Sequence, residues 1–301
     1  MYVITGATGN TGSVVARELI SKGQKVRVIG RNADRLKSLS AEGAEVVACD
    51  ITDATGLTRA FSGATGVYAM IPPNLTSQNF PEYATRVSEA TAAAIEQTGV
   101  RHVVTLSSVG ADKPSGTGPV AGLHAYEERL NRIPGLNVLH LRAGYFMENT
   151  LAQIGMIQHM SICAGPLRPD LKLGMIAAKD IGVAAAGRLL RLDFKGSQTM
   201  ELLGQRDITM AETATIIGNA IGKPGLVYMQ APNEQVRPAM IQMGMSPHFT
   251  DLLLEMSGAL NSGFMRALEP RSAQNSTPTS YETFVAEDFT PRYKQATITA
   301  A

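Results

Sequence analysis

The sequence predicts an α/β fold: a Rossmann-type, doubly wound parallel sheet with a smaller, mostly helical C-terminal substrate region. Three observations predict this class. Short apolar runs rich in β-branched residues alternate with helical patterns, a glycine-rich turn follows the first run, and the alternation loosens after about residue 150 of 301. Strands that alternate with helices form right-handed βαβ units, which place parallel strands in one sheet with helices on both of its faces.

The first half of the chain carries the strand and helix pattern most clearly. Its apolar runs are nearly continuous, which is typical of parallel strands that are buried on both faces. Strands are expected at 1–5, 25–30, 44–50, 66–71, 101–108 and 137–144. Helices are expected at 12–22, 33–42, 55–61, 80–98 and 121–132.

The second half of the chain is less regular. Helices are expected at 149–160, 178–191, 209–221, 233–243 and 249–261, and strands at 198–204 and 226–230. We therefore expect a Rossmann domain at 1–150, a C-terminal substrate-binding region at 151–290 with some elements returning to the sheet, and a weakly ordered tail at 291–301. Methionines are concentrated in the second region, where they either fill a helical core or line a pocket for a flat apolar ligand.

Composition and charge exclude several classes of function. Lys and Arg number 27 against 26 Asp and Glu, and they are spread along the chain, so a nucleic-acid partner is not expected. Cys49, Cys163 and the five histidines lack metal-ligand spacing, so no metal is expected. No apolar run is long enough to span a membrane. We expect a cytoplasmic protein that is a monomer or a homodimer and acts on a small molecule.

The strongest motif is the glycine loop that follows the first strand. Gly6, Gly9 and Gly12 stand three residues apart in a GxxGxxG pattern. In a dinucleotide-binding loop the first glycine allows the tight turn, the second lets the backbone approach the pyrophosphate, and the third lets the helix lie close to the strand. The helix N-terminus then offers free amide groups to phosphate. The predicted cofactor contacts in this loop are Gly6, Ala7, Thr8, Gly9, Asn10, Thr11 and Gly12.

The residue after the second strand indicates which dinucleotide binds. Arg31 stands where an NAD-preferring protein usually carries Asp or Glu, and a guanidinium can hold a 2′-phosphate that a carboxylate would repel. We therefore predict that the cofactor is NADP(H), with an ordinary exposed arginine as the alternative interpretation of Arg31. Asp50 and Ile51 follow the third strand, where Asp50 is a candidate partner of the adenine amino group, the N-cap of the next turn, or both.

Five segments together resemble the NmrA-like family of atypical short-chain dehydrogenases/reductases. They are TGATGNTG at the start of the chain, VIGRN and CDITD after the second and third strands, LSSVGA at the fifth strand, and LRAGYFMEN after the sixth. The resemblance covers residues 1–160 well and the remainder in its general plan. It implies an NADP(H)-binding protein, since the family includes NADP-sensing regulators, quinone reductases, a triphenylmethane reductase and the isoflavone-reductase branch.

The tyrosine and lysine that ordinary short-chain dehydrogenases use are missing. No tyrosine has a lysine four residues later, and Tyr126, which is nearest to the expected place, is followed there by Leu130. The segment from His124 to Glu128 is similar to the His-x-x-x-Glu of the quinone and triphenylmethane reductase branch. His124 is therefore the catalytic candidate, as a group that polarises or protonates a substrate oxygen. Its alternative role is a hydrogen bond to Glu128 one helical turn along.

Further candidates follow the carboxyl ends of the strands, where ligands bind in folds of this class. The segment 70–72 ends the fourth strand and would lie along the cofactor, and Ser107 and Ser108 end the fifth. Tyr145 and Phe146 follow the sixth strand, where simple packing at a strand–helix junction is the alternative. The predicted cofactor contacts in these segments are Met70, Ile71, Pro72, Ser107, Tyr145 and Phe146.

These features predict an NADPH-dependent oxidoreductase that transfers hydride to a small planar electrophile such as a quinone. Such a transfer needs little more than alignment of the nicotinamide with an electrophilic carbon, so the missing Tyr/Lys pair is tolerated. The alternative is a non-catalytic redox regulator that senses NADP(H) and acts through a protein partner. A sugar-nucleotide epimerase uses a similar glycine loop, but its chemistry needs the absent pair.

Overall fold

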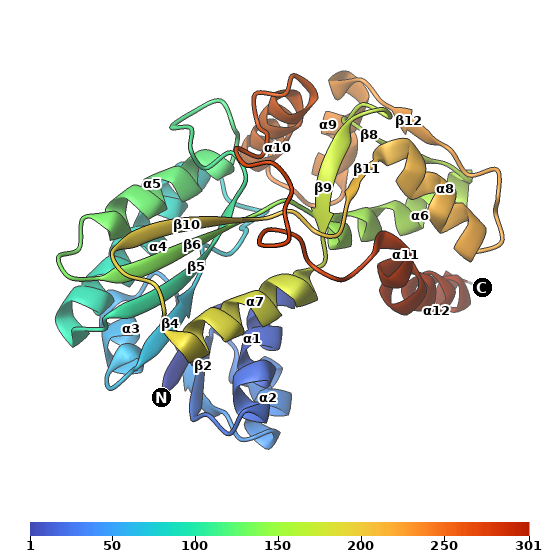
Figure 1. The fold of residues 1–301 in the computed structure, drawn as a ribbon. Helices are drawn as coiled ribbons and strands as arrows, with labels where there is room; N and C mark the ends of the chain where they lie inside the picture. Colours follow the sequence, from blue (N-terminus) through green and yellow to red (C-terminus); the bar gives the residue numbers. More distant parts are fainter. Residues whose placement is uncertain (301) are drawn as a thin grey trace.

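The parallel sheet expected from the sequence is present, and a strand from the second half of the chain extends it. The computed structural model describes residues 1–300, with side chains described for 1–296. Seven parallel strands lie in the order β10-β6-β5-β4-β1-β2-β3 (Figure 1). They are β1 (Tyr2–Ile4), β2 (Val26–Gly30), β3 (Glu45–Ala48), β4 (Gly66–Ala69), β5 (His102–Ser108), β6 (Asn137–Ala143) and β10 (Ser197–Leu202). The prediction of a Rossmann-type α/β fold is confirmed.

Helices cover both faces of the sheet, each group over its own apolar core. One face carries α3 (Ala54–Phe61), α4 (Phe80–Thr98) and α5 (Val120–Asn131), and the other carries α1 (Asn10–Ser21), α2 (Lys37–Ala41) and α7 (Ala178–Arg191). The short 3₁₀ helix η1 (Ala33–Leu36) leads into α2. Because both faces are covered, the strands are apolar on both sides, which explains the nearly continuous apolar runs of the sequence.

The strand order places a crevice at the carboxyl ends of β1 and β4. From β1 the chain adds β2 and β3 on one side, and it then returns to add β4, β5 and β6 on the other side. The loops that follow β1 and β4 therefore diverge to opposite faces of the sheet, and such a reversal is where open α/β sheets bind their ligands. The glycine loop leaves β1 at this point.

The second half of the chain forms a smaller lobe beside the sheet (Figure 1). One small sheet has the order β11-β9-β7 and the other pairs β12 with β8. These strands are β7 (Tyr145–Phe146), β8 (Cys163–Gly165), β9 (Lys172–Ile176), β11 (Asp207–Thr209) and β12 (Tyr228–Gln230). The helices are η2 (Met147–Gln153, 3₁₀), α6 (Ile154–Met160), α8 (Met210–Ala220), α9 (Asn233–Gln242), α10 (Pro247–Asn261), α11 (Tyr281–Phe284), η3 (Val285–Phe289, π) and α12 (Thr290–Ala300).

Two features of this half differ from the sequence-based expectations. The strands β7, β8, β9 and β11 were not expected, because they are too short to show a clear period-two pattern. The segment 291–301, expected to be a weakly ordered tail, continues instead as α12 up to residue 300, and residue 301 lies outside the described residues. The helix is favoured there because α11, η3 and α12 run on without a break and Tyr293 packs against the core of the small lobe.

A buried histidine joins β5 and β6 in the middle of the sheet. His140 is fully buried, with Nδ1 2.7 Å from the Thr105 hydroxyl and Nε2 3.0 Å from Oδ1 of Asn131. A neutral ring with its proton on Nε2 satisfies both partners, since it accepts from the hydroxyl and donates to the amide oxygen. Burial lowers the pKa of His140 to about 4. The folded protein therefore holds this ring in its neutral form.

Acid is expected to destabilise the protein through His140. The unfolded chain binds a proton near pH 6.5 that the folded chain excludes, so this contribution is complete above about pH 6.5 and falls as the pH drops toward 4. We expect the free energy of unfolding to lose about 2–3 kcal/mol between pH 7 and 4.5 from this group. Urea titrations of the wild type and His140→Gln measure the difference. Equal pH dependence in the two proteins would contradict it.

Candidate functional site

The glycine loop adopts a backbone in which each glycine meets a different demand. Gly6 has φ +61°, a left-handed conformation that favours glycine, and the sulfur of Met70 would lie 2.5 Å from a Cβ placed there. Gly12 packs directly on the backbone of Gly6, since its Cβ would lie 2.7 Å from the Gly6 carbonyl carbon. Gly9 caps α1 in an extended conformation, with only the Gly6 carbonyl oxygen near its Cβ position, at 3.2 Å.

The other loop residues divide into buried and exposed groups. Ala7 and Thr11 are buried, and the Thr11 hydroxyl accepts a hydrogen bond of 2.9 Å from Tyr68, so both support the loop from below. Thr8, Gly9 and Asn10 are exposed at the N-terminus of α1. An exposed helix N-terminus with free amides at the switch point of the sheet is the arrangement that holds a pyrophosphate.

A cavity of about 210 Å³ lies against this loop, and we call it the glycine-loop cavity. The structure brings together here eight of the residues predicted to contact the cofactor, although they come from four separate segments of the chain. It is lined by Gly6, Thr8, Gly9, Ile29, Gly30, Arg31, Cys49, Asp50, Ile51, Met70, Pro72, Pro73, Asn74 and Tyr83. Ile71 does not line it and lies instead in the core under α4. Asn74 and Tyr83 were not predicted, because they follow β4 without any motif that marks them.

Arg31 and Asp50, two charged residues of this cavity, differ in their hydrogen bonding. Arg31 is exposed, and among the residues that the structure describes it has no ion pair. Asp50 accepts hydrogen bonds through Oδ1 from the backbone amide of Thr52 at 2.8 Å and from its hydroxyl at 2.7 Å. The amide hydrogen bond, assisted by the hydroxyl, lowers the pKa of Asp50. Its carboxylate is thus a fixed acceptor at the rim, whereas the Arg31 guanidinium is free to bind an anion.

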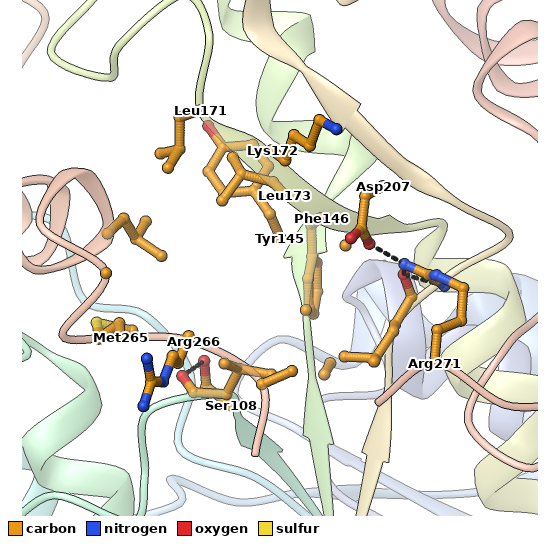
Figure 2. Close-up of a pocket in the computed structure, with 18 of the residues that line it drawn as sticks. Ser108, Tyr145, Phe146, Leu171, Lys172, Leu173, Asp207, Met265, Arg266 and Arg271 are labelled. Atoms are coloured by element: carbon orange, nitrogen blue, oxygen red, sulfur yellow. Dashed lines mark hydrogen bonds and ion pairs between the residues drawn. The ribbon is translucent and has the colours of Figure 1, made fainter. Parts of the chain in front are cut away.

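A second cavity of about 460 Å³ lies further along the same edge of the sheet, and we call it the strand-end cavity (Figure 2). Ser108 ends β5, Gly144 follows β6, and Tyr145 and Phe146 form β7 on its wall. Apolar side chains from β9, from the residue before it and from α10 complete much of the lining: Leu171, Leu173, Met256 and Leu260. Burial raises the pKa of Tyr145 to about 12, so its phenol stays protonated at neutral pH. The cavity therefore has an apolar wall beside the strand ends, and its remaining lining adds charged side chains: Lys172, Asp207, Arg266, Glu269 and Arg271.

Ser107, although predicted to contact cofactor, faces away from both cavities. Its hydroxyl donates a hydrogen bond of 2.5 Å to Oε1 of Glu127, and it is buried. Arg142 donates to both oxygens of the same carboxylate, at 3.0 and 2.6 Å. Only 5% of the Glu127 side chain and 13% of the Arg142 side chain are exposed. This buried network ties α5 to the ends of β5 and β6, and so fixes the strand ends that line the strand-end cavity.

The structure places His124 away from both cavities. Its Nδ1 lies 2.9 Å from the carbonyl oxygen of Ala111, and the ring faces a separate hollow between α4 and α5. The alternative, a hydrogen bond from His124 to Glu128, is not formed either, and the Glu128 carboxylate instead lies 4.0 Å from the Arg132 guanidinium. The glutamate of the His-x-x-x-Glu segment is Glu128, and its side chain is exposed. The glutamate that α5 buries is its neighbour Glu127. Neighbouring helical residues point about 100° apart, which explains the difference.

Replacing His124 by alanine is therefore expected to lower kcat/KM by less than about tenfold. A general acid contributes about 10²–10⁴-fold, but this ring lines neither cavity and one nitrogen contacts a carbonyl. Steady-state rates of NADPH oxidation with a quinone acceptor measure the effect. A loss near the upper end of that range would show that His124 reaches the substrate after a rearrangement.

Other kinds of site find no support in the described part of the chain. Within residues 1–300, no group of three His, Cys, Asp or Glu side chains is arranged to hold a metal ion. No described helix combines the length and the apolar character needed to cross a membrane. The free thiols of Cys49 and Cys163 are both buried.

The fold and the glycine loop define a Rossmann-type nucleotide-binding protein. The chain belongs to the NmrA-like family, whose model matches residues 2–284. It is 26% identical over 258 residues to an NAD(P)H azoreductase of Xenophilus azovorans, covering 85% of this chain and 86% of the relative. It is 30% identical over 267 residues to the uncharacterized oxidoreductase YesF of Bacillus subtilis, covering 87% and 85%.

A solved structure shows the same fold over the whole chain. The NADPH-dependent quinone oxidoreductase of Escherichia coli, complexed with NADPH, superposes with a TM-score of 0.76 at 21% identity, covering 99% of this chain and 100% of that one. The resemblance inferred from five short segments is therefore confirmed at the level of the family. It extends through the smaller lobe, beyond the residues 1–160 where the motifs lie.

Proposed function

We propose that this protein is an NADPH-dependent oxidoreductase that reduces a small planar electrophile such as a quinone. One observation carries the proposal: two cavities lie along the same carboxyl edge of the sheet, one at the glycine loop and one at the ends of β5 and β6. A dinucleotide bound along this edge would have its adenosine end beside Arg31 and its nicotinamide toward Gly144 and Tyr145.

The residues of the two cavities fit the two roles. The glycine-loop cavity offers exposed helix amides, a free guanidinium and a fixed carboxylate, as a phosphorylated nucleoside requires. The strand-end cavity offers leucine, methionine and aromatic side chains that can pack against a flat ring. When bound, NADPH supplies a hydride, and a quinone then needs only one proton from solvent to become a hydroquinone. The protein's own task is to align the acceptor and to exclude water.

The relatives support the same class of activity. One is named an NAD(P)H azoreductase, another an oxidoreductase, and the solved quinone oxidoreductase holds NADPH. A quinone accepts hydride to give a resonance-stabilised hydroquinone anion, which can take its proton from solvent without a dedicated acid. This agrees with the position of His124 outside the strand-end cavity.

The proposal is tested by NADPH fluorescence titration, followed by a screen for NADPH oxidation with quinones, azo dyes and simple carbonyl compounds. We expect tight NADPH binding and turnover with at least one quinone or azo dye. NADPH binding without turnover of any acceptor would exclude the enzyme. It would favour the non-catalytic sensor, which predicts that NADPH and NADP⁺ complexes differ in limited proteolysis.

Replacing Arg31 by aspartate is expected to weaken NADPH binding by about ten- to a hundredfold and to change NADH binding much less. A charge-assisted contact to phosphate is worth about 1.5–3 kcal/mol, and only NADPH carries the 2′-phosphate. Calorimetry with both cofactors measures the two dissociation constants. Arg35→Asp is the matched control, since Arg35 lies in η1 and does not line the cavity. Equal affinity of the wild type for NADPH and NADH would contradict the role of Arg31.

A further inference from the structure

A strap of residues 263–271 closes one side of the strand-end cavity. The strap begins just after the end of α10. Its residues that line the cavity are Gly263, Met265, Arg266, Ala267, Glu269, Pro270 and Arg271. Figure 2 shows Met265 and Arg266 beside Ser108, across the cavity from Tyr145 and Leu171. The strap belongs to the smaller lobe, and no sequence motif marks it.

The strap is held firmly on both sides of Arg266. The Met265 side chain is buried against Ala111, Val120 and Ala259. Its backbone amide donates a hydrogen bond of 2.9 Å to the carbonyl oxygen of Ala259. On the other side the buried carboxylate of Glu201 accepts hydrogen bonds from the backbone amides of Leu268, at 2.9 and 3.1 Å, and Glu269, at 3.0 Å. The backbone around Arg266 is therefore fixed against the large sheet.

The cations of this cavity differ in whether they are already paired. Arg271 binds Asp207 and donates to the carbonyl oxygens of Leu203 and Gly204, so its charge and its hydrogen bonds are used within the protein (Figure 2). Arg266, in contrast, has no hydrogen bond or ion pair among the described residues. Glu269 also lines the cavity, but no ion pair joins it to Arg266.

We propose that the strand-end cavity takes a planar electrophile that carries an anionic group, and that Arg266 binds this group. This inference rests on the proposed function and adds the class of substrate. A guanidinium matches the two oxygens of a carboxylate, sulfonate or phosphate with parallel hydrogen bonds. The apolar wall formed by Leu171, Leu173 and Phe146 receives the flat ring, while Arg266 lies at the opposite side and fixes its orientation.

Lys172 also lines this cavity, but it fits the role less well. Figure 2 draws it on the side of Leu171 and Leu173, away from Arg266. Its ammonium is a compact charge on a flexible stem, whereas the Arg266 fork stands on an anchored backbone. A single orienting contact opposite an apolar wall is enough to distinguish an anionic from a neutral acceptor of the same shape.

A matched pair of acceptors tests the proposal: 1,4-naphthoquinone and its 2-sulfonate. The sulfonate changes the reactivity of the ring itself, but that change is the same for every variant and cancels when variants are compared. We expect Arg266→Gln to lower kcat/KM for the sulfonate by about ten- to a hundredfold, mainly through KM, and to leave the neutral quinone nearly unchanged. The dissociation constant of NADPH should not change. A loss shared by both acceptors, or weaker NADPH binding, would overturn the proposal.

Two further measurements test whether the effect is specific to Arg266 and whether the anionic group binds without turnover. Lys195→Gln removes the same charge from an exposed site outside both cavities, and it should leave the ratio of the two acceptors as in the wild type. Calorimetry of naphthalene-2-sulfonate against 2-naphthol, on the NADP⁺ complex, tests the anion site without turnover. If neither quinone is reduced, the proposed function fails, whereas selective sulfonate binding that depends on Arg266 would still support the anion site. Equal binding of both compounds would overturn it.

Discussion

Replacing Gly9 by valine is expected to lower the affinity for NADPH at least about a hundredfold, or about 2.7 kcal/mol, while the protein stays folded. The fold itself does not require glycine here, because the backbone is extended and only the Gly6 carbonyl oxygen lies near the position of a Cβ. The outer side of Gly9 faces the glycine-loop cavity, where a pyrophosphate would have to touch the backbone. Calorimetry with NADPH and a urea titration measure the two effects separately.

Gly12→Ala is the control that shows the opposite behaviour. A Cβ on Gly12 would lie 2.7 Å from the carbonyl carbon of Gly6, within the backbone of the loop, so the substitution should destabilise the fold. Gly9→Val should lower the free energy of unfolding by only about 1 kcal/mol, the usual range for a changed N-cap. Near-normal NADPH affinity in folded Gly9→Val would show that the cofactor does not use this loop.

Replacing Glu127 by alanine is expected to lower the free energy of unfolding by about 3–5 kcal/mol. The substitution leaves the Arg142 guanidinium largely buried without its carboxylate and removes the acceptor of the Ser107 hydroxyl. An isolated buried charge costs far more than the pair contributes when it is intact. Replacing Glu127 and Arg142 together by methionine should therefore destabilise the protein less than Glu127→Ala alone.

Glu128→Ala is the matched control for this effect. Glu128 is the next residue of α5, but 52% of its side chain is exposed and its carboxylate lies 4.0 Å from Arg132. Exposed ion pairs of this kind contribute about 0–1 kcal/mol. Urea denaturation of Glu127→Ala, Glu128→Ala and the double methionine variant measures the free energy of unfolding of each. Similar losses of this free energy for Glu127→Ala and Glu128→Ala would refute the role of the buried ion pair.

The glycine-loop half of the candidate site was predictable because its residues follow strands directly. Gly6, Arg31, Asp50 and Met70 each stand at or just after the carboxyl end of a parallel strand, and neighbouring parallel strands bring such residues to one edge. Local pattern therefore determines spatial proximity there. Position at the end of a strand does not show which way a side chain points, because successive residues of a strand face opposite sides. Ser107 therefore bonds Glu127, whereas Ser108 lines the strand-end cavity.

The strand-end cavity was largely beyond the reach of sequence reasoning. Met256, Met265 and Arg266 reach it through long-range packing of the smaller lobe, and no local pattern encodes which strand that lobe approaches. The methionines show the same difficulty. In the methionine-rich segments, Met256 and Met265 line the strand-end cavity, Met265 also packs in a small apolar core, and Met243 lies exposed.

The position of β10 has a consequence for how the chain is made. β10 pairs along its full length with β6, from Ser197 to Leu202, although β6 already ends at Ala143. During synthesis, β6 is therefore an unprotected sheet edge until Leu202 has left the ribosome, and an unpaired edge recruits other strands. A fragment ending at residue 150 keeps this edge open permanently and also lacks α7 over α1. Such a fragment should aggregate, although it contains every glycine of the nucleotide loop.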